Sequence, residues 1–215
     1  MKKTVHTLIL AIVTVVFLVF AALRVLGTSP SERIGRAVAN LGPQGKTVVA
    51  RVNGDPITLE DVEANKEALL SANTGIKSDR EAYTEALRAQ IRKVVLNQKA
   101  KEAGMSVTEE EVDNVIDSLN DDQRKFLQLQ VKVRGGDTDL KRNKDIREVF
   151  SSLLLGNKLL AKLRNEGKSP QEIEELVAQW MSDANIVIYQ QSLPDAAASV
   201  TIQDILLLEK DILSP

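Results

Sequence analysis

Residues 49–58 read VARVNGDPIT, and this stretch places a strand, a tight turn and the start of a helix in close succession. The β-branched residues of Thr47–Val52 predict a strand, because branched side chains favour extended backbone. Asn53 and Gly54 form the strongest short turn signal in the chain, since both residue types tolerate positive φ. Pro56 has no backbone N–H to donate, so we expect no further central strand pairing after this turn.

A helix and a second strand complete the expected framework. Thr58 is followed three residues later by Asp61, a capping-box-like spacing that predicts a helix to about Leu70. The segment NIVIY at Asn185–Tyr189 is again β-branched and is the only good partner for Thr47–Val52. Because an isolated short strand is unstable in water, we predict that the two segments pair and close the domain as a small two-stranded sheet.

Amphipathic segments occupy most of the chain between those strands, and each combines a capping residue with apolar residues at helical spacing. The predicted helices run from Ser78 to about Gly104, from Thr108 to Leu119, from Asp121 to about Val133, and from Ser169 to Met181. A further predicted helix carries apolar residues from Ile146 to Leu160 and ends at Glu166. Aromatic residues make up only 3% of the chain, which is low for a β-sandwich. We therefore expect a mainly α fold, a helical array closed by the small sheet, with an N-terminal transmembrane helix.

The first 26 residues predict delivery to a membrane. Two lysines precede an apolar stretch from Val5 to Leu23 that ends at Arg24. As a helix this stretch rises about 28 Å, close to the ~30 Å hydrocarbon thickness of a bilayer. A signal peptide cut after Ala21 is the alternative, although the apolar run exceeds the ~7 to 15 residues of an ordinary signal core. Either outcome exports the rest of the chain.

The expected domain organisation follows from these segments. Residues 1–26 form a transmembrane signal anchor, 27–46 a spacer rich in Ser, Pro and Gly, 47–190 the globular domain, and 191–215 a linker with an amphipathic helix. The short basic head resembles the first region of a secretory signal, which places the amino terminus in the cytoplasm. We thus expect a single-pass protein of the inner or cytoplasmic membrane, with its C-terminal domain on the periplasmic or outer face.

Charge and histidine content exclude several function classes. The formal net charge is −2 with both signs evenly mixed, so we expect no nucleic-acid binding. The only histidine, His6, lies in the apolar segment, which leaves no imidazole for a catalytic triad or a zinc site. The sequence GPQGKT at 42–47 resembles the end of a phosphate-binding loop, but it precedes a predicted strand where that motif requires a helix. We expect no catalytic residue, no metal and no cofactor.

The segment VARVNGDPIT at 49–58 resembles the opening of the SurA-type N-terminal chaperone domain, found in SurA-, PrsA- and PpiD-like foldases. The similarity continues through GMSVTEEEVD at 104–113 and the glycine break at Gly135 to the closing NIVIY strand, and so covers Thr47–Gln190. It implies binding of unfolded or newly exported polypeptides through apolar surfaces, without ATP. Those foldases carry a parvulin domain, for which the interval between Glu166 and Asn185 leaves no room, so we expect no prolyl isomerase activity.

The resemblance predicts a membrane-tethered extracytoplasmic holdase or folding factor. A membrane-anchored scaffold or assembly protein that binds one specific partner is the alternative. Phe126, Leu127 and Leu129 crowd more apolar surface onto one short helix than a single helix face can bury. These three residues are therefore the candidate contacts for a polypeptide client.

The C-terminal segment carries a second candidate contact. Ile205, Leu206, Leu208 and Ile212 are too apolar for a free surface helix, so we expect this tail to dock. Three partners are open to it: an apolar cleft of its own domain, a second copy of the chain, or the membrane surface. In the first case the tail would mimic a client and compete with one.

Overall fold

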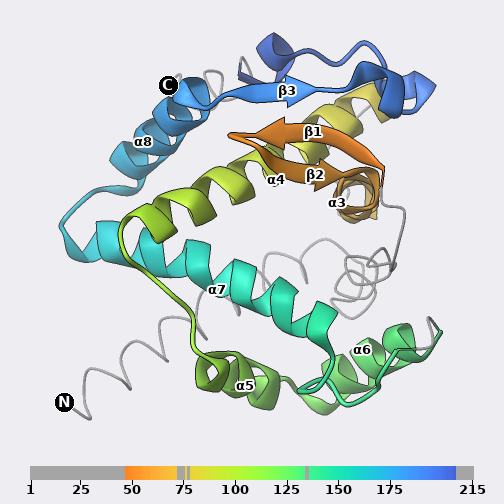
Figure 1. The fold of residues 1–215 in the computed structure, drawn as a ribbon, viewed down its shortest axis with the longest axis vertical. Helices are drawn as coiled ribbons and strands as arrows, with labels where there is room; N and C mark the ends of the chain where they lie inside the picture. The colour runs from red at the N-terminus through yellow and green to blue at the C-terminus, as the bar shows by residue number, and fades with distance from the viewer. Residues whose placement is uncertain (1–46, 72–75, 77, 134–135, 207–215) are drawn as a thin grey trace.

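The computed structural model describes residues 47–71, 76, 78–133 and 136–206. The chain begins with strands β1 (Val48–Val52) and β2 (Asp55–Thr58). The helices that follow are α3 (Leu59–Ser71), α4 (Asp79–Glu102), α5 (Glu109–Ser118), α6 (Asp121–Val133), α7 (Lys144–Asn165) and α8 (Pro170–Asp183) (Figure 1). Strand β3 (Ile186–Ile188), the 3-10 helices η1 (Gln190–Ser192) and η2 (Asp195–Ala197), and helical residues 202–206 complete the order. The mainly α expectation is confirmed.

The predicted anchor at 1–26 and spacer at 27–46 lie outside the described residues. Among the residues that the structure describes, no helix is both long and apolar enough to span a bilayer.

The predicted pairing of the domain's two ends is confirmed, but the sheet has three strands rather than two. Its antiparallel order is β2-β1-β3, with Arg51 of the central strand between Pro56 and Val187. The expectation that Pro56 excludes further central pairing holds, but Asp55–Thr58 forms an edge strand that the sequence analysis did not predict. Proline is tolerated because β2 is an edge strand, where the missing N–H would point away from β1. The pairing of β1 with β2 is a hairpin around Asn53 and Gly54.

The hairpin turn also links the sheet to its surroundings. Asn53 and Gly54 have φ values of 50° and 93°, the left-handed backbone that a two-residue hairpin loop requires. The Asn53 side-chain oxygen accepts a hydrogen bond from the Asn185 N–H at 2.8 Å, and its amide donates to Gln98 at 2.8 Å. The turn thus joins both ends of the domain and the long helix α4.

Helix starts follow the capping residues that the sequence indicates. Thr58 precedes α3 and accepts a hydrogen bond from the Asp61 N–H at 3.3 Å. Helices α5 and α8 begin with complete capping boxes, and α8 also has a proline in its first turn. These local bonds satisfy N–H groups that a helix leaves unpaired at its amino end.

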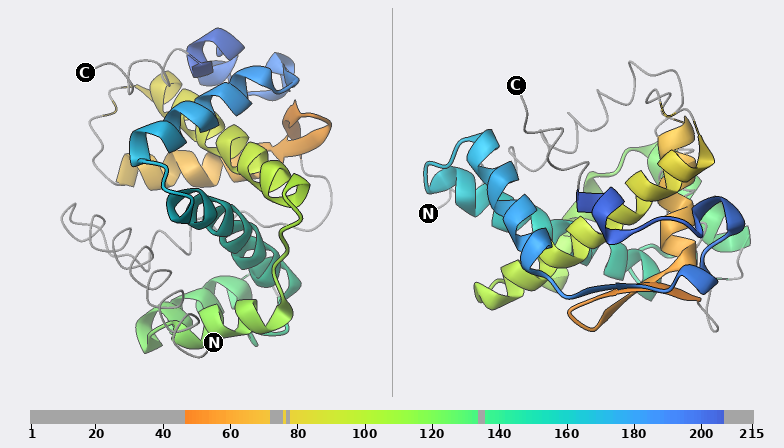
Figure 2. Two further views of the ribbon diagram at one scale, coloured as in Figure 1. Left: turned by 90° about the vertical axis from the view of Figure 1, so that its left-hand side faces the viewer. Right: turned by 90° about the horizontal axis from the view of Figure 1, so that it is seen from above.

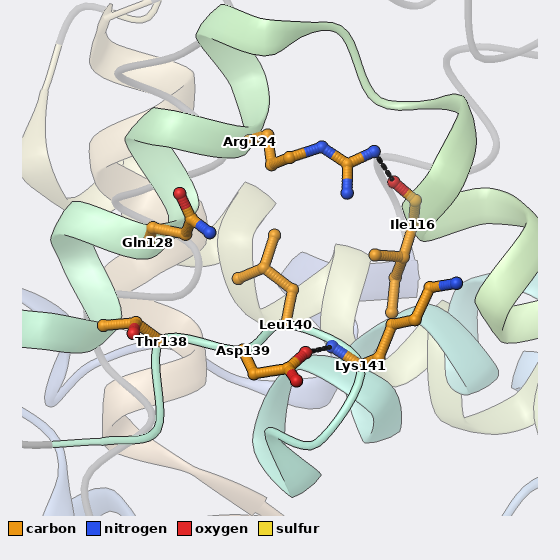
Figure 3. A pocket seen from close by; sticks show the side chains of 7 residues that line it. All are labelled: Ile116, Arg124, Gln128, Thr138, Asp139, Leu140 and Lys141. Atoms are coloured by element: carbon orange, nitrogen blue, oxygen red, sulfur yellow. Dashed lines mark hydrogen bonds between the residues drawn. The ribbon is translucent and has the colours of Figure 1, made fainter.

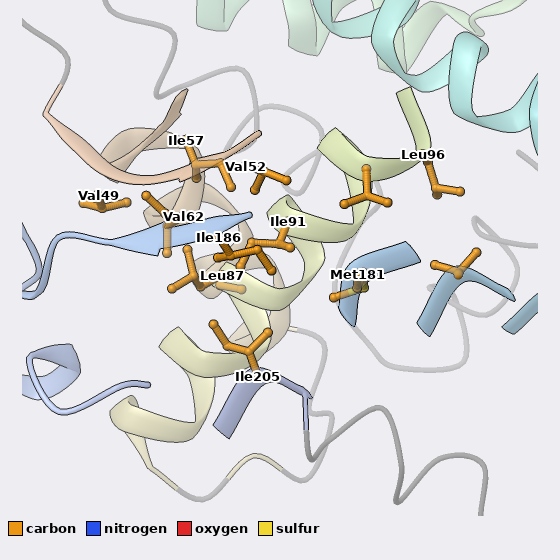
Figure 4. Packing of buried hydrophobic residues seen from close by; sticks show 14 of the residues in the cluster. Val49, Val52, Ile57, Val62, Leu87, Ile91, Leu96, Met181, Ile186 and Ile205 are labelled. Carbon is orange, nitrogen blue, oxygen red and sulfur yellow. The ribbon is translucent and has the colours of Figure 1, made fainter. Parts of the chain in front are cut away.

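The buried residues form two clusters. The main core joins the sheet, α3, α4, α8 and the C-terminal half of α7, and its members include Val49, Val52, Ile57, Val62, Leu87, Ile91, Leu159, Met181 and Ile186 (Figure 4). The small core consists of Val112, Ile116, Leu127, Val131, Leu140, Ile146 and Leu154. Helix α7 contributes to both clusters and lies between the sheet-containing part of the molecule and helices α5 and α6. The left view of Figure 2 shows the same arrangement.

Candidate functional site

Helix α5 is fixed to α7 by two basic side chains of α7. The Lys158 ammonium lies 2.6 Å from the Glu111 carboxylate and donates to the Ser106 carbonyl at 2.7 Å. The Arg147 guanidinium pairs with Asp113 at 2.5 Å and with Glu109. Because the three acids belong to the first turns of α5, these pairs hold the part of that helix nearest the positive end of its dipole.

The pKa values of these acids report the same contacts. Partial burial opposes ionisation of Glu111, but hydrogen bonds from Lys158 and from the Thr108 backbone outweigh burial and lower the pKa below its ordinary 4.5. A hydrogen bond from Arg147 lowers the pKa of Asp113. Both carboxylates are therefore more readily ionised in the folded chain than in the unfolded chain.

Acid should release α5 before it unfolds the main core. A depressed carboxyl pKa contributes stability that is present above the unfolded pKa and is lost as the pH falls through the folded pKa, here below 4.5 for Glu111. We expect the opening free energy of α5, measured by amide exchange at Val112 and Ile116, to fall between about pH 6 and about pH 3. E111Q should flatten this dependence, whereas E110Q, at an exposed residue of the same turn, should not. Equal slopes in both variants would contradict the assignment.

Helix α6 does not present the three candidate client residues on one face. Leu127 is fully buried in the small core. It therefore contributes to the packing of the domain and is not exposed to a client, unlike the expectation from the sequence. Leu129 is 56% exposed, and Phe126 is half-buried one turn before it. Residues three apart lie on neighbouring positions of a helix surface, so Phe126 and Leu129 share the side that points away from Leu127.

Leu153 of α7 is an exposed apolar residue that the sequence reasoning did not identify. Its side chain is 50% exposed, whereas Leu154 packs in the small core and Leu155 in the main core. Consecutive helical residues are separated by about 100°. Three successive leucines therefore point in three directions, and α7 packs against a core in only two of them. The run of three leucines was the sign in the sequence that one of them is exposed.

A pocket of about 350 Å³ lies beside the small core, lined by Ile116, Arg124, Gln128, Thr138, Asp139, Leu140 and Lys141 (Figure 3). Its two basic side chains serve the end of α5: Arg124 donates to the Ile116 carbonyl at 2.9 Å, and Lys141 pairs with Asp117 at 2.8 Å. These two contacts stabilise the carboxyl end of α5, so both basic side chains have a structural role. Within the described residues, no group of acidic or histidine side chains is arranged to hold a metal ion.

The tail packs onto its own domain as far as the structure describes it. Ile205 is fully buried in the main core, the same cluster as Leu87, and Leu206 packs against it (Figure 4). The Arg80 guanidinium of α4 donates to the Asp204 carboxylate at 3.0 Å and to the Ser199 hydroxyl at 3.1 Å. The other two candidate docking residues, Leu208 and Ile212, lie outside the described residues.

Comparison with known proteins gives one result. The family model described as the SurA-like N-terminal domain matches residues 1–132, which covers more than half of the chain and includes the hairpin and helices α3 to α5. No curated protein matches the chain. No solved structure matches it either.

Proposed function

The chain belongs to the SurA-like N-terminal domain family, and from this premise we propose that it is a chaperone that binds unfolded or newly exported polypeptides without ATP. We further propose that residues 1–26 tether it to the inner or cytoplasmic membrane, with the domain on the extracytoplasmic side. The family is of the chaperone type and supports the binding of polypeptide clients. The membrane tether is supported by the basic start and the apolar stretch from Val5 to Leu23.

The observation that carries the client-binding proposal is the exposure of Leu129 and Leu153. Both belong to helices that contribute other residues to the small core, α6 through Leu127 and α7 through Leu154. Each exposed leucine therefore belongs to a helix that is already held in place by packing, so binding a client does not require ordering that helix. Phe126 adds a half-buried aromatic ring beside Leu129.

The expected strength of this contact suits a holdase. Burying one exposed leucine contributes at most about 1.5–3 kcal/mol, from which the cost of association is subtracted. Two or three such residues give weak binding that releases a client readily. A tether raises the effective concentration of the domain near the membrane, so several weak contacts along one exported chain are sufficient.

The test is suppression of aggregation by the full-length chain in detergent micelles, with a chemically unfolded test protein and no nucleotide. We expect the double variant L129S/L153S to lose most of the suppression, because two exposed apolar contacts are removed. L70S is the matched control, since Leu70 is 45% exposed but lies on α3, away from the small core. Proline-limited refolding of a test protein should show no acceleration.

Two results would contradict the proposal. Equal loss of activity in L70S and in the double variant would show that these leucines have no special role. Failure of the wild-type chain to suppress aggregation, together with crosslinking to a single stoichiometric partner in membranes, would favour a scaffold that holds one protein.

A further inference from the structure

The two outer edges of the sheet differ in their ability to accept another strand. In an antiparallel pair, successive residues direct their backbone N–H and C=O groups alternately toward the partner strand and away from it. The hydrogen bonds from Asn53 to Asn185 and from Tyr189 to Val49 fix this alternation between β1 and β3. The register then assigns every backbone group of both edge strands to one side or the other.

The outer edge of β2 offers no donor at its central position. Val52 is opposite Asp55 across the two-residue loop, which is the position at which the strands of such a hairpin exchange hydrogen bonds. The next residue, Pro56, is therefore the one that points outward, and proline has no N–H. This edge is closed to regular strand addition by its sequence.

The outer edge of β3 is complementary to an extended backbone. Val187 lies opposite Arg51 and directs its backbone groups toward β1, so the N–H and C=O groups of Ile186 and Ile188 point outward. Within the part of the chain that the structure describes, these outward groups have no hydrogen-bond partner. Seen from above, the chain after β3 passes over α4 (Figure 2, right). Ile186 is 8% exposed and Ile188 is half-buried, so the accessible part of this edge is small.

The size of this edge decides between its possible occupants. A three-residue strand is about 10 Å long. Pairing of two copies through β3 would bury far less than the ~1,000 Å² of a specific stable interface, so the edge does not support a homodimer. A short edge instead fits a transient contact with an extended chain, in which backbone bonds form with any sequence except proline at the bonding positions.

We propose that the outer edge of β3 takes an extended segment of an unfolded client as a fourth strand, an inference that rests on the function proposed above. The backbone groups of Ile186 and Ile188 supply the hydrogen bonds. Val187, which is 42% exposed, and the exposed Arg51 beside it form the outer face against which alternate client side chains lie. The chaperone then holds clients in two ways, by side chains at α6 and α7 and by backbone at β3.

Amide exchange measured by NMR on the full-length chain in micelles tests this proposal. The probe is a synthetic peptide of alternating valine and threonine with lysines at its ends, and the control is the same peptide with N-methylated backbone amides. With the unmodified peptide, the Ile186 and Ile188 amides should exchange at least about tenfold more slowly. The Val187 amide, already bonded to β1, should not change. Equal protection by the N-methylated peptide would overturn the proposal.

A pair of variants isolates the backbone donor. Ile188→Pro removes an outward N–H and leaves the bonds between β1 and β3 in place, whereas Ile188→Ala loses similar packing but retains the N–H. We expect the proline variant to lose peptide binding and the alanine variant to keep it; equal binding would refute the edge contact. Protection of Ile186 and Ile188 that depends on protein concentration and needs no peptide would also refute it, in favour of a second copy.

The same experiment separates this proposal from the function on which it rests. Peptide-induced changes confined to α6 and α7 would reject the strand edge and leave the chaperone function intact. Absence of peptide binding together with absence of aggregation suppression would reject both.

Discussion

Replacing Ile205 with alanine should lower the free energy of unfolding of the full-length chain by about 2–5 kcal/mol. The side chain is fully buried in the main core, so truncation removes apolar contacts and leaves a cavity. Ile202→Ala is the matched control, because Ile202 lies one turn earlier and is 36% exposed. Its effect should stay within about 0.5 kcal/mol. Urea unfolding followed by circular dichroism measures both values.

This comparison decides what the tail is. Leu193, Ala197 and Val200 are buried in the same cluster as Ile205, so residues 193–205 form part of the main core. If Ile205→Ala leaves the unfolding midpoint unchanged, the tail is a detachable segment that can compete with clients. A large loss of stability shows instead that the domain cannot release this part of its tail and remain folded.

Leu127→Ala should also cost about 2–5 kcal/mol, whereas Leu129→Ala, two residues further on, should change stability by no more than about 0.5 kcal/mol. Leu127 is fully buried in the small core and Leu129 is mostly exposed. Amide exchange should show the loss first in α5 and α6, because the small core holds these helices. Aggregation suppression should respond in the opposite order, with Leu129→Ala weakening it in a folded protein. Similar stability losses in the two variants would contradict this placement of α6.

Sequence patterns predicted the elements well where the signal is local. Capping residues such as Ser169 and Glu172 satisfy backbone N–H groups within one helix turn, so their meaning does not depend on the rest of the fold. The pairing of β1 with β3 was predictable because two short strands in a helical chain have few other partners. The third strand, β2, was not predicted, since proline is compatible with an edge strand and the sequence does not show which segments form one.

The candidate site was less accessible to sequence reasoning. Phe126, Leu127 and Leu129 correctly indicated more apolar surface than one helix face can bury, but only the packing against α5 and α7 shows that Leu127 is the inward residue. Leu153 was missed because helical periodicity describes one buried face, whereas α7 has a different buried face in each half. The outward groups of β3 depend on strand register, which amino-acid type does not determine.

The placement of β1 at the centre of the sheet has a consequence for the order in which the chain folds. Val52 pairs with Ile186 across the sheet, so nearly the whole domain lies between β1 and β3 in the sequence. Closing so long a loop is slow, because its entropy is lost before the contact forms. As the chain emerges on the extracytoplasmic side that we propose for the domain, the hairpin and α3 can form early, but β1 keeps one side unpaired until residues 186–188 arrive. For that interval the nascent protein exposes an unpaired strand edge of its own, and it requires the protection from aggregation that we propose it gives to others.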